Sequence, residues 1–576
     1  MSMKNLLVFI LLLNAGIVVA SPVKPTEAFR KAMAFFKNKE VTVESLNYVE
    51  PQNLAKGRDV VSASNPAFYA FNNGENEGFV IIAGDDLLPD VVGYAPDGYI
   101  PDIYDELPCC LRLFLDSYTQ YVDDVRQGKA KKPAKANGVS MGTPVVEPLL
   151  TSKWGQDSPY NMYCPNNDPV GCVATAMAQI LLKWKWPETG KGSLTYTNDY
   201  GEYTTDFSQS TYNWSIMRPS YSTLDIKKRV EACEAAALIS KDCGMATYMS
   251  YNPSGSGTHS QYVPRALVKF FSYKASTLDY MRRDCCSSKE RFLSIIKHEL
   301  DEGRPVYFSA KSSTGGGSDA GGHAFVVDGY DTEDFVHVNW GWNGSSNGYY
   351  DVSVMDGSSY TFNGDQCIYY GIEPDYEGID TTLRQCRIYL VNAPVVIIKS
   401  VSQSKTFDVK IKVFYNSHPF SNSFHIAIGM FDYDGQLLDI VTTDDNNTFL
   451  AAWNGFSDYD PLTCKVPEKY SAEGYYYLSV VTRQDGYDDW VLPDKTGGPE
   501  KNRIYIHVKD GLVYFNEERP ELNGDINGDG SVNITDVVET INLIAAGSYS
   551  SAADLNADNA VNISDVVQII NIIAGL

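Results

Sequence analysis

A turn followed by a helix is predicted by the stretch Asp168-Pro169-Val170-Gly171-Cys172-Val173-Ala174-Thr175-Ala176-Met177-Ala178-Gln179-Ile180-Leu181-Leu182. Asp-Pro and Gly mark the turn, and from Val173 to Trp184 apolar residues recur at the spacing of one helix face, before Pro187 limits the helix. Cys172 therefore opens the helix, where unpaired N–H groups and the positive end of the helix dipole stabilise a thiolate. A buried structural cysteine is the ordinary alternative, so the choice depends on the rest of the chain.

Length and composition indicate a folded protein of several domains. A chain of 576 residues is too long for one core and should contain about three or four domains. A hydrophobic content of 44% with 39 tyrosines favours strand-rich folded material. The net charge of −25 disfavours nucleic acid and inserted or anionic membrane partners, because its field repels phosphate. The basic run at 129–135 is better interpreted as a solvated, protease-sensitive linker.

The N-terminus has the features of a secretory signal. Lys4 precedes an apolar run from Leu6 to Leu13, and Val18-Val19-Ala20 offers small or modest residues to a signal peptidase. We therefore expect a signal peptide at 1–20 and a secreted, extracellular protein that is soluble or attached to a surface. No later run approaches the ~18 apolar residues that span a bilayer.

The sequence contains eleven cysteines, which is an odd number. If Cys172 is a free reactive thiol, the other ten can pair, and the spacing leaves their pairing open. Neither Cys109-Cys110 nor Cys285-Cys286 has the C-x-x-C spacing of a zinc site, so the sequence predicts no zinc site.

Periodicity divides the chain after the signal into four segments. A hairpin at 68–83 and a helix at 111–125 predict a separate unit at 21–140. Residues 141–378 alternate helical and strand patterns, which predicts an α+β domain, and alternating runs such as 407–414 predict a β-sandwich at 379–518. Trp453 and Trp490 in that segment could form a sugar-binding platform, but packing in the core or at its rim is the favoured interpretation.

The last segment, 519–576, contains an internal repeat offset by 29 residues. Oxygen-bearing side chains recur at positions 1, 3, 5, 9 and 12 of two loops, with Gly530 and Asn559 where a left-handed turn is needed, which suits the oxygen shell of Ca²⁺. An amphipathic helix follows each loop, and the two helices can bury their apolar faces only against each other. We expect two structural Ca²⁺ ions, one in each loop. The ligand positions of the first loop are Asp525, Asn527, Asp529, Ser531, Asn533 and Asp536. Those of the second loop are Asp554, Asn556, Asp558, Ala560, Asn562 and Asp565.

A nucleophilic thiol needs a base, and His323 is the favoured one of the seven histidines. It follows a glycine-rich loop and begins a strand, and a hairpin turn centred near 331–332 would place Asn339 opposite it. The Asn339 side chain could then fix the orientation of the ring, with Trp340 shielding that bond from water. His337 shares the face of Asn339 and is the main rival as the base.

An oxyanion formed by attack of the thiol also needs hydrogen-bond donors. Gln156, in Trp154-Gly155-Gln156, could join the backbone N–H of Cys172 in this role. The letters G-x-S-x-G at 344–348 suggest a serine hydrolase, but they lie in a polar turn rather than between a strand and a helix, so we reject that reading.

The sequence resembles the streptopain family of papain-like cysteine peptidases over about residues 21–375. The resemblance lies in Gly171-Cys172-Val-Ala-Thr-Ala, in Gly322-His323-Ala-Phe-Val-Val-Asp-Gly, in Val338-Asn339-Trp340-Gly341-Trp342 and in Trp154-Gly155-Gln156. It implies an endopeptidase with Cys172 as nucleophile, His323 as base and acid, Gln156 as oxyanion donor, and support of His323 by Asn339 or Trp340. It also implies protein substrates, no catalytic cofactor, a mobile flap at 312–322, and an inhibitory propeptide at 21–140 that is removed near 137–147, making the chain a zymogen.

The C-terminal region from Leu522 to Leu576 resembles a dockerin. Aspartate stands at position 12 of both loops where an EF-hand has glutamate, and the first flanking helix is missing. The resemblance implies Ca²⁺-dependent docking onto a cohesin module of a scaffoldin or cell-surface protein, as in a cellulosome that degrades polysaccharide.

An inactive adhesion or inhibitor protein on a peptidase fold is the alternative from another functional class. Intact Cys172, His323 and Gln156, together with an inhibitory segment that would be pointless without activity, favour the peptidase.

Overall fold

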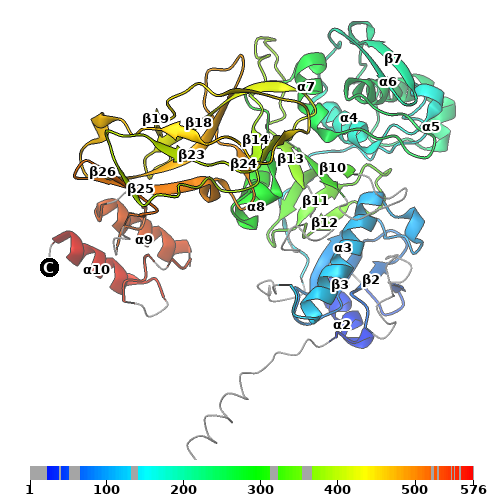
Figure 1. The fold of residues 1–576 in the computed structure, drawn as a ribbon. Helices are drawn as coiled ribbons and strands as arrows, with labels where there is room; N and C mark the ends of the chain where they lie inside the picture. Colours follow the sequence, from blue (N-terminus) through cyan, green and yellow to red (C-terminus); the bar gives the residue numbers. More distant parts are fainter. Residues whose placement is uncertain are drawn as a thin grey trace, which may run out of the picture. The chain divides into compact units, whose positions relative to one another are not determined.

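The computed structural model describes residues 22–37, 41–50, 65–130, 140–311, 322–352, 366–519, 524–528, 531–546, 548–550, 552–556 and 560–574. The chain forms two compact units, Met1–Arg384 and Gln385–Leu576 (Figure 1). The second unit begins close to the predicted boundary at 379. The predicted signal peptide, linker residues 131–139 and the flap up to residue 321 lie outside the described residues.

The N-terminal segment of the first unit contains the predicted hairpin and helix. The hairpin pairs Phe68 with Ala83, and the Asn73 N–H donates to the Gly78 carbonyl at 2.8 Å. Its regular elements are α2 (Pro25–Phe35), β1 (Leu46–Val49), β2 (Phe68–Asn73), β3 (Phe79–Ala83), β4 (Val91–Ala95) and α3 (Cys109–Arg126). The predicted hairpin and helix are thus confirmed, and α3 begins two residues earlier than the predicted helix, but the segment belongs to the same compact unit as the residues that follow it rather than to a separate unit.

The remainder of the first unit mixes helices and strands, as an α+β fold requires. Its elements are β5 (Pro144–Val146), α4 (Cys172–Trp184), β6 (Ser193–Asn198), β7 (Gly201–Asp206), α5 (Thr223–Lys228), α6 (Val230–Ala246), α7 (Val263–Phe271), β8 (Asp279–Arg282), α8 (Lys289–Asp301), β9 (Val306–Lys311), β10 (Gly322–Asp331), β11 (Val336–Asn339), β12 (Gly348–Tyr350) and β13 (Cys367–Tyr370). Apart from the small hairpin of β6 and β7, the strands belong to the sheet described next.

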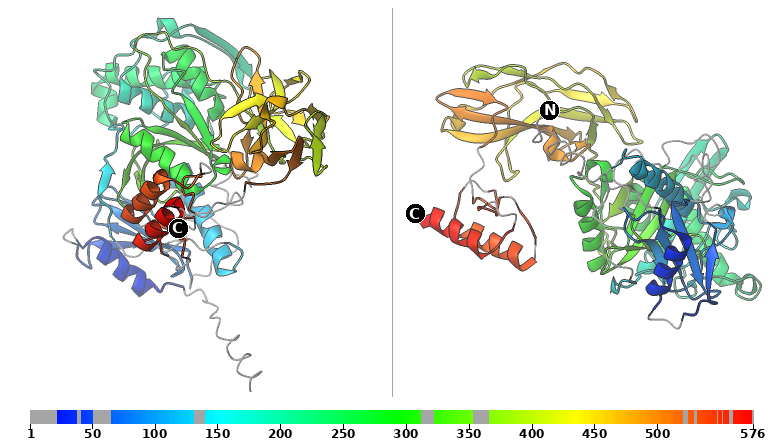
Figure 2. Two further views of the ribbon diagram at one scale, coloured as in Figure 1. Left: turned by 90° about the vertical axis from the view of Figure 1, so that its left-hand side faces the viewer. Right: turned by 90° about the horizontal axis from the view of Figure 1, so that it is seen from below.

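One sheet runs through the N-terminal segment and the α+β domain. Its strand order is β1-β2-β3-β4-β12-β11-β10-β9-β13-β8, with β5 added beside β10. The seam lies between β4 and β12, where Tyr94 pairs with Tyr349 and Gly93 with Tyr350. In Figure 2 the blue N-terminal strands lie beside the green strands of the domain. The two segments therefore share backbone hydrogen bonds and form one folded unit.

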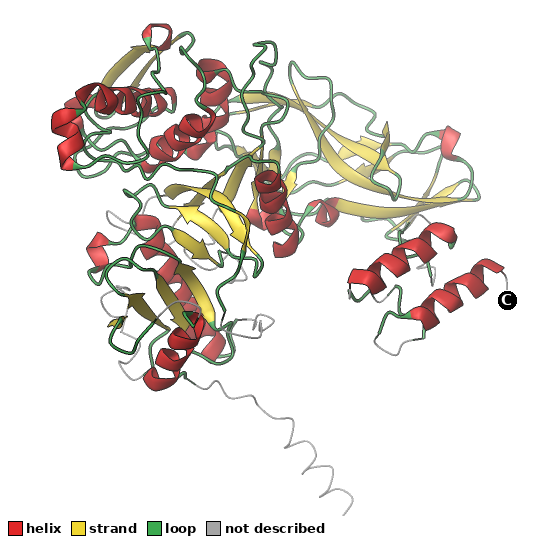
Figure 3. Ribbon diagram, turned by 180° about the vertical axis from the view of Figure 1, so that it is seen from behind, coloured by secondary structure: helices red, strands yellow, loops and turns green. Residues whose placement is uncertain are grey.

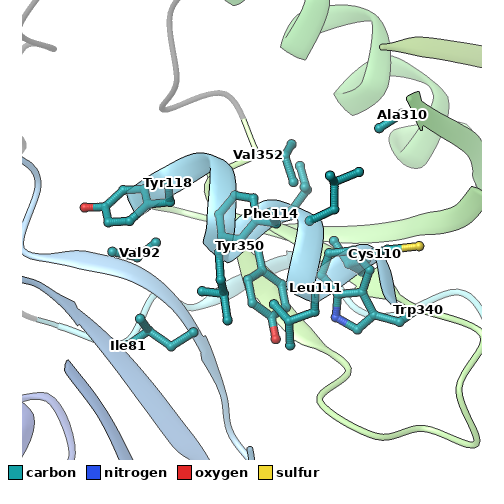
Figure 4. Packing of buried hydrophobic residues seen from close by; sticks show 14 of the residues in the cluster. Ile81, Val92, Cys110, Leu111, Phe114, Tyr118, Ala310, Trp340, Tyr350 and Val352 are labelled. Carbon is teal, nitrogen blue, oxygen red and sulfur yellow. The ribbon is translucent and has the colours of Figure 1, made fainter. Parts of the chain in front are cut away.

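The two faces of the sheet are covered by different helices, because successive strand residues point to opposite sides. In β10, Phe325 and Val327 belong to a core that includes residues of α3 and α8, whereas Ala324 and Val326 belong to a core with α4, α6 and α7. Figure 4 shows α3 side chains packed against residues of the domain. The N-terminal helix α3 is thereby fixed on the same sheet that carries His323.

The β10–β11 hairpin has a different register from the predicted one. Asn339 pairs with Val326, three residues beyond His323, and Val336 pairs with Tyr330. The turn is therefore centred near residue 333, where the Asp331 N–H donates to the Phe335 carbonyl at 3.0 Å, and a bulge between Val327 and Gly329 moves the register back by only one residue. The prediction that Asn339 lies directly opposite His323 is wrong for these reasons.

The second unit begins with a β-rich segment. Its strands are β14 (Ile388–Leu390), β15 (Ser400–Ser402), β16 (Phe407–Val409), β17 (Phe414–Asn416), β18 (Asn422–Phe431), β19 (Leu437–Ile440), β20 (Asn447–Leu450), β21 (Gly455–Phe456), β22 (Leu462–Cys464), β23 (Gly474–Gln484), β24 (Asp494–Lys495), β25 (Arg503–Lys509) and β26 (Leu512–Phe515). They form sheets in the orders β15-β26-β25-β23-β18-β19, with β20 beside β18, β21-β17-β14-β24, and β16-β22. Residues of all three sheets contribute to one core, and Figure 3 shows the strands in yellow. Trp453 is half exposed, while Trp490 packs in a small apolar cluster with Phe431.

The C-terminal segment contains α9 (Ile534–Ala546) and α10 (Ile563–Ala574), which are the regular elements among its described residues. Val537 of α9 and Val566 and Ile569 of α10 form a small shared core. The predicted packing of the two repeat helices against each other is present. Among the described residues, no helix is both long and apolar enough to cross a membrane.

Candidate active site

Cys172 is the first residue of α4, as predicted. The preceding Gly171 has φ +88°, a left-handed backbone conformation that L side chains rarely adopt, so the position favours glycine. The helix ends at Trp184, where Lys185 adopts a left-handed conformation. The thiol is half-buried at the helix N-terminus, among N–H groups that favour a thiolate.

His323 is the second residue of β10 and lies against two thiols. Its Nδ1 is 3.1 Å from Sγ of Cys109, the first residue of α3. Burial by itself would lower the pKa of the ring, but Cys109 and, to a smaller degree, a hydrogen bond with Cys172 raise that pKa to about 10. A hydrogen bond with Cys110 and the charge of His323 hold the pKa of the Cys109 thiol well below its ordinary value. The structure therefore places the His323 ring beside the Cys109 thiol, with Cys172 close enough to contribute to the raised pKa of the ring.

Asn339 belongs to a buried network that does not include a described contact with His323. Its Nδ2 donates to the Ser152 carbonyl at 2.7 Å and to Oε1 of Gln179 at 3.2 Å, and its Oδ1 accepts from the Gly341 N–H at 3.1 Å. Support of the His323 ring by Asn339 stays a prediction.

Gln179 is a site residue that the sequence interpretation missed. It is fully buried on α4, and its Oε1 also accepts from the Ser152 hydroxyl at 3.0 Å and the Trp154 N–H at 3.1 Å. It therefore joins the helix that carries Cys172 to β11 and to the loop that carries Gln156. An amide within the apolar run of that helix was the available signal.

The loop that carries Gln156 is hydrogen-bonded to the turn that precedes Cys172. The Gln156 carbonyl accepts from the Val170 N–H at 2.9 Å, which holds the Trp154-Gly155-Gln156 loop against the turn before α4. The oxyanion role of its side-chain amide stays a prediction. Trp340 is buried, donates from Nε1 to the Ser346 carbonyl at 3.0 Å and packs on Phe325, with ring centres 4.9 Å apart.

The rival base, His337, is engaged elsewhere. Its Nδ1 lies 2.6 Å from Oδ1 of Asp328, and Oδ2 of that carboxylate accepts from the Leu150 N–H at 2.9 Å. Of the two histidines, His323 is the one whose described partners include Cys172.

No sequence pattern indicated that the vicinal pair Cys109-Cys110 would reach this site. Cys110 is buried in the core of the first unit, near Trp340 in Figure 4. Sγ of Cys109, Sγ of Cys110 and a ring nitrogen of His323 all lie within 4.8 Å of one another. None of the eleven cysteines, all within the described residues, forms a disulfide in the structure.

The C-terminal loops repeat the same hydrogen bonds. Asp536 accepts from the N–H groups of Ile526 at 2.7 Å and Asn533 at 2.8 Å, which closes the first loop. Asp565 does the same with Leu555 and Asn562, both at 2.9 Å. The predicted ligands Asp529 and Asp558 lie outside the described residues. The donor set, carboxylate and amide oxygens on a closed loop, fits Ca²⁺.

Three protein families match segments of the chain. Residues 154–350 match the Peptidase C10 family, residues 20–122 the Spi protease inhibitor, and residues 523–574 the Dockerin type I domain, which binds calcium in general. The first match covers the loop of Gln156, the helix of Cys172 and the strand of His323.

Curated relatives extend these matches. Streptopain of Streptococcus pyogenes is 31% identical over 406 residues, which are 63% of this chain and 97% of streptopain. Thiol protease/hemagglutinin PrtT of Porphyromonas gingivalis is 30% identical over 510 residues, or 84% of this chain, and the chain spans 56% of its length. Among solved structures, prointerpain A of Prevotella intermedia is 29% identical, with 54% of this chain and 96% of that chain covered and a TM-score of 0.45.

The Peptidase C10 match and the relatives named streptopain and thiol protease show the class of the protein, a cysteine peptidase, and a thiol on a helix N-terminus near an imidazole suits that class. With streptopain matched over nearly its whole length, the chain belongs to the streptopain family, the Peptidase C10 family. It carries a Dockerin type I domain at its C-terminus and a segment like the Spi protease inhibitor at its N-terminus.

Proposed function

We propose that the protein is a secreted cysteine endopeptidase, made as a zymogen, with Cys172 as nucleophile and His323 as base and acid. The observation that carries the proposal is that Cys172 on α4 and His323 on β10, far apart in sequence, lie close enough for the Cys172 thiol to raise the pKa of the His323 ring. The family match supports it independently.

In the proposed reaction the Cys172 thiolate attacks the scissile carbonyl of a protein substrate. The oxyanion is bound by the Cys172 N–H and the Gln156 amide, and protonated His323 gives its proton to the leaving amine. Water that His323 deprotonates then hydrolyses the thioester. Asn339 and Trp340 are the residues proposed to support His323 once the inhibitory segment has left.

The N-terminal segment is proposed to act as the inhibitory propeptide. Cys109 at the start of α3 lies 3.1 Å from the His323 ring, so the segment occupies the base that the reaction needs. Its match to the Spi protease inhibitor agrees with this role. Removal near 137–147 would withdraw α3 from the ring.

The decisive test compares two cysteine variants. Under reducing conditions the processed protein should cleave casein, and Cys172→Ala should reduce the rate by at least about a thousandfold. Cys164→Ala, which changes a buried cysteine of the same domain, should retain most of the rate. His323→Ala should behave like Cys172→Ala, and His337→Ala should not. Equal turnover by Cys172→Ala would refute the assignment.

We also propose that residues 519–576 bind two Ca²⁺ ions and dock onto a cohesin module of a scaffold or the cell surface. The matched hydrogen bonds of Asp536 and Asp565 and the dockerin match support this. A purified cohesin should retain the full chain in calcium and release it in excess chelator. Retention that is unchanged by chelator would rule the proposal out.

A further inference from the structure

Three metal-ligating side chains converge where the N-terminal segment meets the α+β domain. Sγ of Cys109, Sγ of Cys110 and a ring nitrogen of His323 lie within 4.8 Å of one another, and the Cys109–His323 pair is only 3.1 Å apart. Cys109 is 214 residues from His323 in the sequence, so the fold alone brings them together.

Buried elements fix the position of all three groups. Cys110 is 1% exposed within the core that joins α3 to Trp340, and its thiol is directed at the Ala324 carbonyl, 4.0 Å away. His323 precedes Ala324 on β10, whose pairing with β9 places His323 opposite Ala310. The three groups are thus held on a helix and a strand, as a preorganised metal site requires.

The three side chains are soft metal ligands, which limits the metals that the site can bind. Two thiolates and an imidazole suit Zn²⁺, whereas Ca²⁺ and Mg²⁺ prefer oxygen. With Zn–S bonds of about 2.3 Å and Zn–N bonds of about 2.0 Å, tetrahedral ligand atoms lie about 3.5 Å apart. The two sulfur atoms and the ring nitrogen reach this separation if their side chains shift by about 1 Å.

We propose that the uncleaved chain binds one Zn²⁺ ion between Cys109, Cys110 and His323, although the spacing of the cysteines alone predicted no zinc site. Water or the neighbouring Cys172 thiol completes the tetrahedron. The ion ties the start of α3 to β10 and occupies the ring that the peptidase reaction uses. The consequence for latency rests on the proposed function, whereas the binding site itself does not.

Zinc binding is tested on the full chain carrying Cys172→Ala, so that it is not processed. The reduced protein is kept in excess Ca²⁺ to saturate the C-terminal loops, and Zn²⁺ is titrated against a chromophoric chelator. One tight site is expected, and Co²⁺ in its place should give the visible absorption of a tetrahedral thiolate complex. Adding Cys109→Ala and Cys110→Ala together should weaken binding at least a hundredfold.

A matched control uses the other vicinal pair. Cys285→Ala with Cys286→Ala removes two buried cysteines of the same unit and should leave the tight site intact. His323→Ala should also weaken the site, which decides the matter should the Cys109/Cys110 variant fail to fold. Equal zinc affinity in all variants, or loss only with Cys285 and Cys286, would overturn the proposal.

A maturation assay separates this proposal from the proposed function. In the chain with Cys172 intact, Zn²⁺ should delay loss of the N-terminal segment, and the Cys109/Cys110 variant should mature with a much smaller delay. Tight zinc binding without any Cys172-dependent proteolysis would retain the site and refute the peptidase. Cys172-dependent proteolysis without tight zinc binding would support the peptidase and refute the zinc site.

Discussion

At the scale of single residues, Gln179 determines how the parts of the candidate site are held together. It is fully buried, and its one side-chain oxygen accepts from Ser152, Trp154 and Asn339. The residues it contacts lie on the loop of Gln156 and on the strand after His323. A buried amide of this kind specifies one arrangement, because each unsatisfied partner costs free energy.

We expect Gln179→Leu to destabilise the first unit by about 2–4 kcal/mol, because it leaves the buried Trp154 N–H without its acceptor. The measurement is urea unfolding of the full chain in the Cys172→Ala background. Gln209→Leu, an exposed glutamine of the same domain, is the control and should change stability little. An unchanged unfolding midpoint for Gln179→Leu would show that the network carries no stability.

His418 gives the second unit a dependence on pH. Burial lowers the pKa of its ring to about 4 from 6.5, and Nε2 lies 3.2 Å from the Arg387 carbonyl. Since the folded-state pKa is depressed, the stability that this histidine contributes is present above pH 6.5 and is lost as the pH falls through about 4. The ring is half-buried, so the loss amounts to no more than about 3 kcal/mol.

We therefore expect His418→Asn to flatten the acid side of the stability profile of the second unit between pH 6.5 and 4. Thermal unfolding across that range, on the Cys172→Ala chain, measures it. His298→Asn, on the exposed face of α8, serves as control. A profile that stays equally steep in His418→Asn would contradict the assignment.

At the scale of elements, the seam between β4 and β12 holds the N-terminal segment on the domain. Tyr94 donates its hydroxyl proton to Oδ2 of Asp331 at 2.5 Å, and its ring stacks on Tyr349 with centres 5.1 Å apart. Burial raises the pKa of Asp331. This contact is the polar link between a strand of the N-terminal segment and the β10–β11 turn.

We expect Tyr94→Phe to speed loss of the N-terminal segment about tenfold, because the buried Asp331 loses a donor and the seam loses roughly 1–2 kcal/mol. Electrophoresis of the maturing full chain follows the rate. The control is Tyr99→Phe, which changes an exposed tyrosine of the same segment. Equal rates for Tyr94→Phe and the unchanged chain would show that the seam does not limit maturation.

Elements with a strong local pattern were predictable from sequence, and their partners were not. Apolar periodicity and Gly171 located α4 with Cys172 at its first residue, and the Asn-Gly turn located the hairpin of β2 and β3. The predicted register of Asn339 was wrong because the turn lies near residue 333 rather than 331–332, and its position depends on local backbone geometry that no letter pattern fixes. The approach of Cys109 to His323 was missed because it depends on the seam between β4 and β12, a non-local pairing.

At the scale of the whole molecule, the C-terminal segment consists of two similar loop–helix units whose helices share a small core. Asp536 and Asp565 each close their own loop, and Val537, Val566 and Ile569 join the two helices. In the proposed calcium binding each loop would hold its own ion, and the shared core makes the fold of each half depend on the other.

We expect Asp536→Ala to remove one of two bound Ca²⁺ ions and to weaken the other about tenfold through the shared core. Asp565→Ala should mirror it, and the double variant should bind none. Isothermal titration of the full chain with Ca²⁺ reads the stoichiometry. Asp444→Ala, in the β-rich segment, is the control. Two ions still bound in the double variant would exclude this ligand assignment.

The shared sheet of the first unit also has a consequence for the proposed maturation, in which the N-terminal segment is removed. Once β1–β4 depart, β12 changes from an interior strand into the border of its sheet, and Tyr349 and Tyr350 lose the rings and backbone that cover them. Such borders invite pairing with foreign strands, and β12 limits this hazard by being only three residues long. The proposed removal of the N-terminal segment therefore frees the active site but also exposes a strand edge that favours aggregation. The short length of β12 limits that aggregation.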